Sequence, residues 1–303
     1  MTWTALAALG ILLAGAPALP GIAIKTKAFL SGRRGAPVLQ LYYDLVKLLR
    51  KGSIYSNTTT WVFRAGPVVA LASLLAAALL LPLDGQAAPV HFEGDLLAFA
   101  GLLALGRFAL VLAGLDTGSS FEGMGASREV TFASFAEPGL FLCLIALVLA
   151  TSEVTLSGML GGSLGAAWSR AAPALVLVGI SLFVLLLAEN SRVPVDDPAT
   201  HLELTMIHEV IVLDHSGPDL ALILFGSAVK LALFGALVVG VFVPRAGLNG
   251  ALAIAVLLAG IALVAVLVGV VESVMARLRL TRVPQLLAGA SALALLAVIL
   301  LLR

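Results

Sequence analysis

The stretch LLLAENSRVPVDDPATHLELTMIHEVIVLDHSG, residues 185–217, begins as an apolar run and then becomes densely charged. Three of the four histidines of the chain lie within it. Because ionisable side chains are costly inside a bilayer, we expect the apolar part in lipid and the charged part at a membrane edge. The stretch therefore predicts a membrane helix that opens into a polar loop.

The composition extends this prediction to the whole chain. Of its 303 residues, 61% are hydrophobic and 12% are charged, whereas a soluble domain of this size needs far more polar surface. The net charge of +1 gives no reason to expect a nucleic acid as a partner. Cys143 is the single cysteine, which excludes an internal disulfide and cysteine-ligated clusters. Any redox centre is therefore expected in a partner protein.

Apolar runs long enough to cross a bilayer, which takes ~20 residues, occur eight times along the chain. The runs are continuous rather than alternating, so they do not fit a membrane β-barrel. We expect an all-α polytopic membrane protein that forms a single membrane domain over residues 1–303. The expected spans are residues 3–23, 61–83, 95–115, 130–151, 171–190, 219–243, 249–271 and 284–302.

The distribution of Lys and Arg predicts the orientation. Most of them fall in the odd-numbered loops, which are therefore expected on the cytoplasmic side, with both termini facing outward. The first apolar run has no basic residue before it, so we interpret it as a retained span rather than a signal peptide. These features are typical of the inner membrane of a bacterium or archaeon.

The first loop contains an expected amphipathic helix, VLQLYYDLVKLLRK, residues 38–51. Its apolar residues share one helical face, whereas its charged residues lie elsewhere. We expect it to lie at the membrane interface. The residues of the apolar face are Val38, Leu41, Leu45, Leu48 and Leu49.

Four ionisable side chains interrupt the spans, each at a cost of ~2.5–3.5 kcal/mol on insertion scales. They are Arg107, Glu137, Glu189 and Lys230. Glu137 precedes Pro138, which loosens the helix, so this carboxyl group is predicted to relay protons, with Lys230 as its partner or as a second member. The alternative is a structural ion pair of Glu137 with Arg107 or Lys230. For Arg107 we expect a structural role.

The fifth loop is predicted to fold into a helix over residues 199–213, capped by Asp197. His201 and His208 then share one face with Glu209 beside it, and Asp196 lies near the positive helix end. The segment HEVIV lacks the second histidine of a zinc-binding helix, so we expect no metal. The cluster is interpreted either as a proton-passing site or as a solvated docking surface.

Two other cytoplasmic loops are expected to complete a charged floor. The third loop, residues 116–129, is rich in glycine and is predicted to be pliable. The seventh loop carries Arg277, Arg279 and Arg282, which can pair with acids of the fifth loop.

Four motifs carry a resemblance to a known family. They are AENSRVPVDDPATHLELTMIHEVIVLDHSGPDLAL (188–222), DLVKLLRKGSIYS (44–56), GLDTGSSFEGMGASREV (114–130) and ESVMARLRLTRVPQLL (272–287). Together they resemble the formate hydrogenlyase subunit 4 family, the membrane anchor subunits of group 4 energy-converting [NiFe] hydrogenases. That family is similar in turn to subunit 1 of respiratory complex I.

The resemblance implies a membrane subunit beneath a peripheral redox arm, without a redox centre of its own. Its expected partners are the hydrogenase large and small subunits, an iron–sulfur subunit and antiporter-like membrane subunits, with [NiFe] and iron–sulfur clusters in the partners. The chain is expected to couple electron transfer to proton or sodium translocation. The predicted path residues are Glu137, Glu189, Asp196, Asp197, Glu203, Glu209 and Lys230. The predicted docking residues are Arg128, Glu129, Arg192, His201, His208, Arg277 and Arg279.

Two alternatives remain open on the residues alone. The chain could be the quinone-binding subunit 1 of a complex I-like NADH (or ferredoxin):quinone oxidoreductase, although complex I members carry a shorter acidic pattern in the fifth loop. It could also be a stand-alone ion transporter. The latter is disfavoured because the polar residues gather on one face and no inverted repeat is visible.

Overall fold

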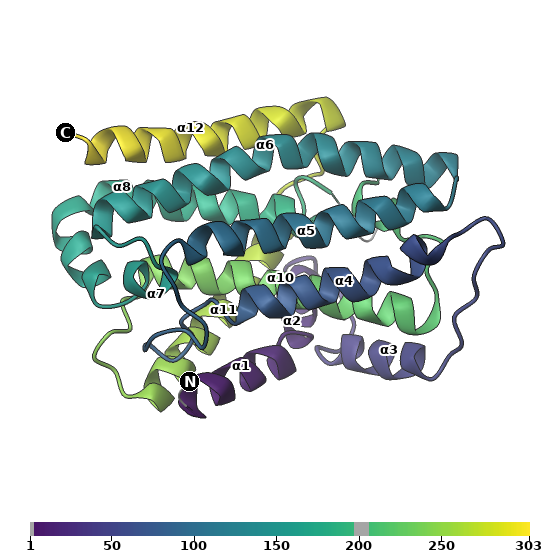
Figure 1. The fold of residues 1–303 in the computed structure, drawn as a ribbon, viewed down its shortest axis with the longest axis horizontal. Helices are drawn as coiled ribbons and strands as arrows, with labels where there is room; N and C mark the ends of the chain where they lie inside the picture. Colours follow the sequence, from purple (N-terminus) through teal and green to yellow (C-terminus); the bar gives the residue numbers. More distant parts are fainter. Residues whose placement is uncertain (1–2, 197–205) are drawn as a thin grey trace.

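In a computed structural model of the chain, residues 3–196 and 206–303 are described, and every regular element among them is a helix. Asp197, His201 and Glu203 lie outside the described residues. The long helices run side by side along the longest axis (Figure 1). The spanning helices are α4 (Trp61–Ala78), α5 (Asp95–Asp116), α6 (Ser120–Thr151), α8 (Ser163–Glu189), α10 (Gly217–Phe242), α11 (Gly250–Val274) and α12 (Val283–Leu301), which continues the 3-10 turn η1 (Leu280–Arg282).

The first span is bent. Helices α1 (Trp3–Gly15) and α2 (Ala18–Leu30) meet at 45°, whereas the sequence predicted one run over residues 3–23. Pro17 lies at the bend, where its ring and missing N–H interrupt the helical hydrogen bonds. Counted with this bent pair, the described part of the chain has eight helical spans, as predicted for a multi-pass membrane protein.

The third loop is wrong as predicted, because most of it is helical. Helix α6 begins at Ser120, so residues 120–129 form its first turns. Gly125 faces the short helix α9 (His208–Ile211), and a Cβ there would lie 3.1 Å from the carbonyl oxygen of Ile207. Close packing against α9 offsets the low helix propensity of glycine.

Helix α3 (Gln40–Leu49) is the predicted amphipathic helix, and its position is visible at the right-hand end of Figure 1. It packs against α2 and α10. Leu41, Leu45 and Leu48 are half-buried, whereas Leu49 is 58% exposed and does not share their environment. The Tyr42 hydroxyl donates to the carbonyl of Ala14, which ties α3 to the bend between α1 and α2.

Helix α10 occupies the centre of the bundle. Its apolar core is 72% buried, against 28–50% for the other spans, because it packs against α4, α8 and α11 at once. A side chain on α10 therefore meets protein rather than lipid, which explains how Lys230 is accommodated in a span.

The loops at the end opposite α3 are joined by Arg245, which is 1% exposed. Its guanidinium donates to the carbonyl oxygens of Leu83 (3.0 Å) and Pro82 (3.1 Å). The neighbouring carboxylate of Asp84 accepts from the Thr4 hydroxyl at 2.8 Å. These bonds hold the start of α1, the α4–α5 loop and the α10–α11 loop together.

Replacing Arg245 with Met should therefore lower the stability of the purified protein. Two buried carbonyl groups lose their donor, at a cost of roughly 2–4 kcal/mol in all. The apparent midpoint of thermal unfolding in detergent measures the effect. Arg170→Met is the matched control, because Arg170 is exposed. Equal midpoints for the two variants would contradict the structural role of Arg245.

Candidate functional site

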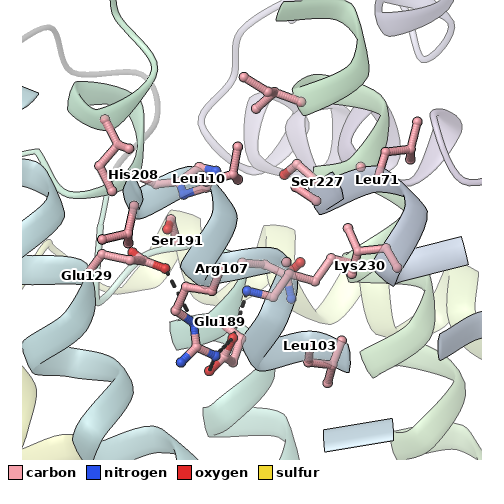
Figure 2. A pocket seen from close by; sticks show the side chains of 18 of the residues that line it. Leu71, Leu103, Arg107, Leu110, Glu129, Glu189, Ser191, His208, Ser227 and Lys230 are labelled. Carbon is pink, nitrogen blue, oxygen red and sulfur yellow. Dashed lines mark hydrogen bonds and ion pairs between the residues drawn. The ribbon is translucent and has the colours of Figure 1, made fainter. Parts of the chain in front are cut away.

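The four ionisable side chains of the spans form one connected network (Figure 2). From α5, Arg107 donates from Nη1 to Glu137 of α6 at 2.7 Å. Its Nη2 donates to both carboxylate oxygens of Glu189, at the end of α8, at 2.7 and 2.8 Å. Lys230 of α10 pairs with Glu189 at 2.7 Å. Glu189 is therefore shared by two cations.

A fifth group, Glu129, lies on the first half of α6. Its carboxylate is 3.8 Å from Nε of Arg107. Three carboxylates thus surround two cations, and if all five groups are ionised the cluster carries a formal charge of −1. Because a low-dielectric interior disfavours a net charge, the cluster has room for one proton.

The structure resolves which pairs form. Glu137 pairs with Arg107, one of the two predicted partners, and Lys230 pairs with Glu189 instead. Arg107 contacts three acids and so lies at the centre of the network, whereas the sequence suggested only a structural role. The adjacent Gly106 allows α4 and α5 to approach closely, since a Cβ there would be 2.5 Å from the Ser73 hydroxyl.

Two hollows flank this network. An inner cavity of about 50 Å³ lies between α4, α5 and α10, large enough for a few water molecules. Glu129, Glu189, His208 and Lys230 line it, as Figure 2 shows. A lateral groove lies between α5 and α6 and is lined by Glu137 and small residues. Arg107 lines both hollows and therefore lies between them.

Glu137 lies on the groove side of this arrangement. Its side chain is 41% exposed, whereas Arg107 is 8% and Glu189 is 7% exposed. A half-exposed carboxylate in the middle of a spanning helix is costly in lipid. The network thus extends from a buried cavity to the lateral surface of the bundle.

The fifth loop differs from the helix predicted over residues 199–213. Met206 and Ile207 are not helical, and the described part of this segment is helical only in α9. The carboxylate of Asp196 accepts from the amides of Ile207 (2.9 Å) and His208 (3.4 Å), and it pairs with Arg277 at 3.0 Å. The expected pairing between the fifth and seventh loops is thereby confirmed for Arg277.

The other predicted site residues lie around this loop. Arg128 donates to the carbonyl of Met206 at 2.8 Å, and Arg192 pairs with Glu272 at 3.4 Å. Glu209 is half-buried, and Arg279 is exposed. Their roles in docking or proton transfer remain predictions, as do those of Asp197, His201 and Glu203, which are outside the described residues.

Sequence reasoning missed a second cluster at the same end of the molecule. The ring of His215 stacks on Phe63 with centroids 3.9 Å apart and planes 9° apart. Glu122 and Asp219 are buried nearby at the starts of α6 and α10. The signal that was available is the run DHSGPD, residues 214–219, which places three ionisable groups around a helix start.

Neither cluster has the form of a metal site. Among the described residues, no group of three or more His, Cys, Asp or Glu side chains could hold a metal ion. Cys143 is buried, and its thiol lies 3.3 Å from the Ser181 hydroxyl. The chemistry that these side chains offer is therefore proton binding and charge pairing.

Comparison with known proteins places this arrangement in a family. A profile described as NADH dehydrogenase matches residues 3–302. Formate hydrogenlyase subunit 4 of Escherichia coli K12 is 33% identical over 282 residues, covering 91% of each chain. Hydrogenase-4 component C of the same organism is 35% identical over 243 residues, covering 79% of this chain and 75% of the relative.

A solved structure shares the fold. It is that of the membrane-bound sulfane sulfur reductase, an archaeal respiratory membrane complex, with a TM-score of 0.83. The sequence identity is 19%, and the match covers 98% of both chains. The resemblance that the four motifs indicated is confirmed.

Removal of Arg107 should destabilise the protein strongly. Arg107→Met leaves three carboxylates with Lys230 as the only cation of the network, and breaking a buried ion pair costs about 3–5 kcal/mol. Adding Glu137→Gln removes one uncompensated charge and should recover part of the loss. The yield of folded protein and its unfolding midpoint measure this, with Arg64→Met, at an exposed position, as the control. A double variant that is no better than Arg107→Met would contradict the pairing.

Acid should weaken the folded state through two histidines outside the spans. Burial lowers the pKa of both His208 and His215 from the usual value of 6.5. Below that pH the unfolded chain binds more protons than the folded chain, so stability is full above about pH 6.5 and is lost as the pH falls. The unfolding midpoint should therefore drop between about pH 7 and pH 5.

The double variant His208→Gln/His215→Gln should show a flatter pH profile than the unchanged protein. His91→Gln, at an exposed position, should leave the profile unaltered. A double variant with the full acid sensitivity would show that other groups cause it.

Proposed function

This chain belongs to the NADH dehydrogenase family, and we propose that it is the membrane subunit of an energy-converting [NiFe] hydrogenase complex of the formate hydrogenlyase type. In this role it anchors a peripheral hydrogenase arm on its cytoplasmic face. It couples electron transfer in that arm to the translocation of protons (or sodium ions) through buried acidic residues. The names of its two Escherichia coli relatives support this assignment.

The proposed setting follows from the family and from the charge pattern. The chain lies in the cytoplasmic membrane of a bacterium or archaeon with both termini outward, because the basic loops favour the inner side. Hydrogenase large and small subunits and an iron–sulfur subunit dock on the face formed by α3, α9 and the seventh loop. Antiporter-like subunits lie beside the bundle within the membrane.

The observation that carries the coupling role is the position of Arg107. It pairs with Glu189 on the cavity side and with Glu137 on the groove side, and it lines both hollows. A proton that reaches Glu189 from the cavity weakens the hold of this carboxyl group on Arg107. Arg107 then pairs more fully with Glu137 and Glu129, which changes the proton affinity on the groove side.

Charge changes in a docked redox arm act on this network through its cytoplasmic edge. His208 and Glu129 line the cavity, and the amide of His208 is bonded to Asp196, which pairs with Arg277. A change of charge above α9 therefore shifts the potential at Glu189 through a short chain of contacts. The lateral groove passes the response to a neighbouring membrane subunit.

The quinone alternative receives less support from the geometry. It calls for a cavity walled by the helix of the first loop. The lining residues of the inner cavity come from α4, α5, α6, α8, α9 and α10 and the residues that follow α8, and none of them belongs to α3. The hydrogenase relatives also cover more of the chain than this alternative needs.

The coupling role is tested by Glu137→Gln in the assembled complex. Glutamine keeps the size of the side chain but cannot take up a proton, so hydrogen turnover should continue while proton uptake per hydrogen falls. Both are measured separately in inverted membrane vesicles. Glu153→Gln, at an exposed position outside the spans, is the control. Normal turnover together with normal proton uptake would remove Glu137 from the mechanism.

A further inference from the structure

The second cluster, formed by Glu122, His215 and Asp219, has a feature that the ion-pair network lacks. His215 is 4% exposed, and neither nitrogen of its ring has a hydrogen-bond partner among the described residues. Its ring is fixed by the stack on Phe63, which is 1% exposed. Burial of an unbonded ring nitrogen is costly, so its persistence here calls for a reason.

The acids of the cluster share this property. Glu122 is fully buried; its Oε1 accepts from the amide of Asp214 at 3.2 Å, and its Oε2 has no partner among the described residues. Asp219 is 9% exposed and likewise has one unpartnered oxygen, Oδ2. Three nearly buried titratable side chains on three segments therefore have unused proton-binding atoms at one end of the bundle.

The register of α10 connects this cluster to the ion-pair network. Asp219, Ile223, Ser227 and Lys230 are spaced by four, four and three residues, so they lie along one face of the helix. Ile223, Ser227 and Lys230 line the inner cavity, and Asp219 lies one turn closer to the cytoplasmic end. Ser227 provides a hydroxyl group on the way to Lys230.

The acid expected to receive protons first, Asp196, is placed differently. Its carboxylate is bound by Arg277 and accepts from two backbone amides. A carboxylate held in this way is stabilised in its charged form and is a poor acceptor. The entrance for protons is therefore better sought where binding atoms are free.

We propose that His215, together with Asp219 and Glu122, forms a proton port that takes protons from the cytoplasm and delivers them through the inner cavity to Glu189 and Lys230. This inference rests on the proposed coupling function. In the transfer, a proton binds one nitrogen of the neutral imidazole ring while another leaves from the second nitrogen. The ring returns to the neutral form without any change in oxidation state.

The surroundings of His215 suit a transient carrier. Burial lowers its pKa, which keeps the ring neutral and ready to accept a proton near neutral pH, while the charges of Asp219 and Asp214 act in the opposite direction. The imidazolium form is thus accessible but not trapped. The charged and titratable groups on the elements around it are Asp214, Asp219, Glu122, Asp116, Arg64 and Tyr55.

The test uses inverted vesicles that contain the assembled complex with His215→Phe. Phenylalanine retains the stack on Phe63 but has no titratable nitrogen. We expect proton uptake per hydrogen turned over to fall by about tenfold or more at neutral pH. Asp219→Asn should act in the same direction. Phe63→Leu, which weakens the stack but keeps the imidazole ring, and His91→Gln should retain coupled uptake.

Glu189→Gln provides the reference that separates the two proposals. If it abolishes coupled uptake while His215→Phe and Asp219→Asn retain it, the port is overturned and the coupling function stands. If Glu189→Gln takes up protons normally, both proposals fail. If His215→Phe does not assemble, His215→Gln and Asp219→Asn decide the matter, since normal uptake by both overturns the port. Loss of uptake in His215→Phe and Asp219→Asn, with assembly and Phe63→Leu intact, supports it.

Discussion

The contact between Arg107 and Glu189 is the constraint on which the interior of this bundle depends. A guanidinium and a carboxylate, each less than a tenth exposed, are tolerated within spanning helices only because each compensates the other. Lys230 and Glu137 extend the pair across four helices. The positions of α5, α6, α8 and α10 relative to one another are therefore fixed by electrostatics as well as by apolar packing.

Small residues make this arrangement possible. Gly106 allows α4 to approach α5, and Gly114 and Gly125 leave space for α9 between α5 and α6. Dense packing leaves only a small cavity, which lies on one side of the network, and a groove on the other side. In a membrane, where apolar side chains gain nothing by leaving lipid for each other, such close contacts and polar pairs supply much of the stability.

The polar end of the molecule combines locked and unlocked charges. Asp196, Arg277, Arg192 and Glu272 are engaged in pairs that hold the fifth and seventh loops to the bundle. His215, Asp219 and Glu122 retain unused binding atoms. Groups of the first kind hold the shape of a docking face, and groups of the second kind are suited to exchange protons, so one surface serves two purposes.

The sequence by itself determined the spans, the amphipathic helix and the ionisable residues within the membrane, because each depends on local hydrophobicity and on the high cost of charge in lipid. It also indicated the family, through contiguous motifs. Only the tertiary structure decided that Glu189, not Glu137, pairs with Lys230, that Arg107 is the hub, and that residues 120–129 are helical. The role of His215 was likewise invisible in the sequence, because its stack on Phe63 joins residues 152 positions apart. Pairing between distant helices depends on how they rotate and approach, and a linear pattern of residues does not specify that.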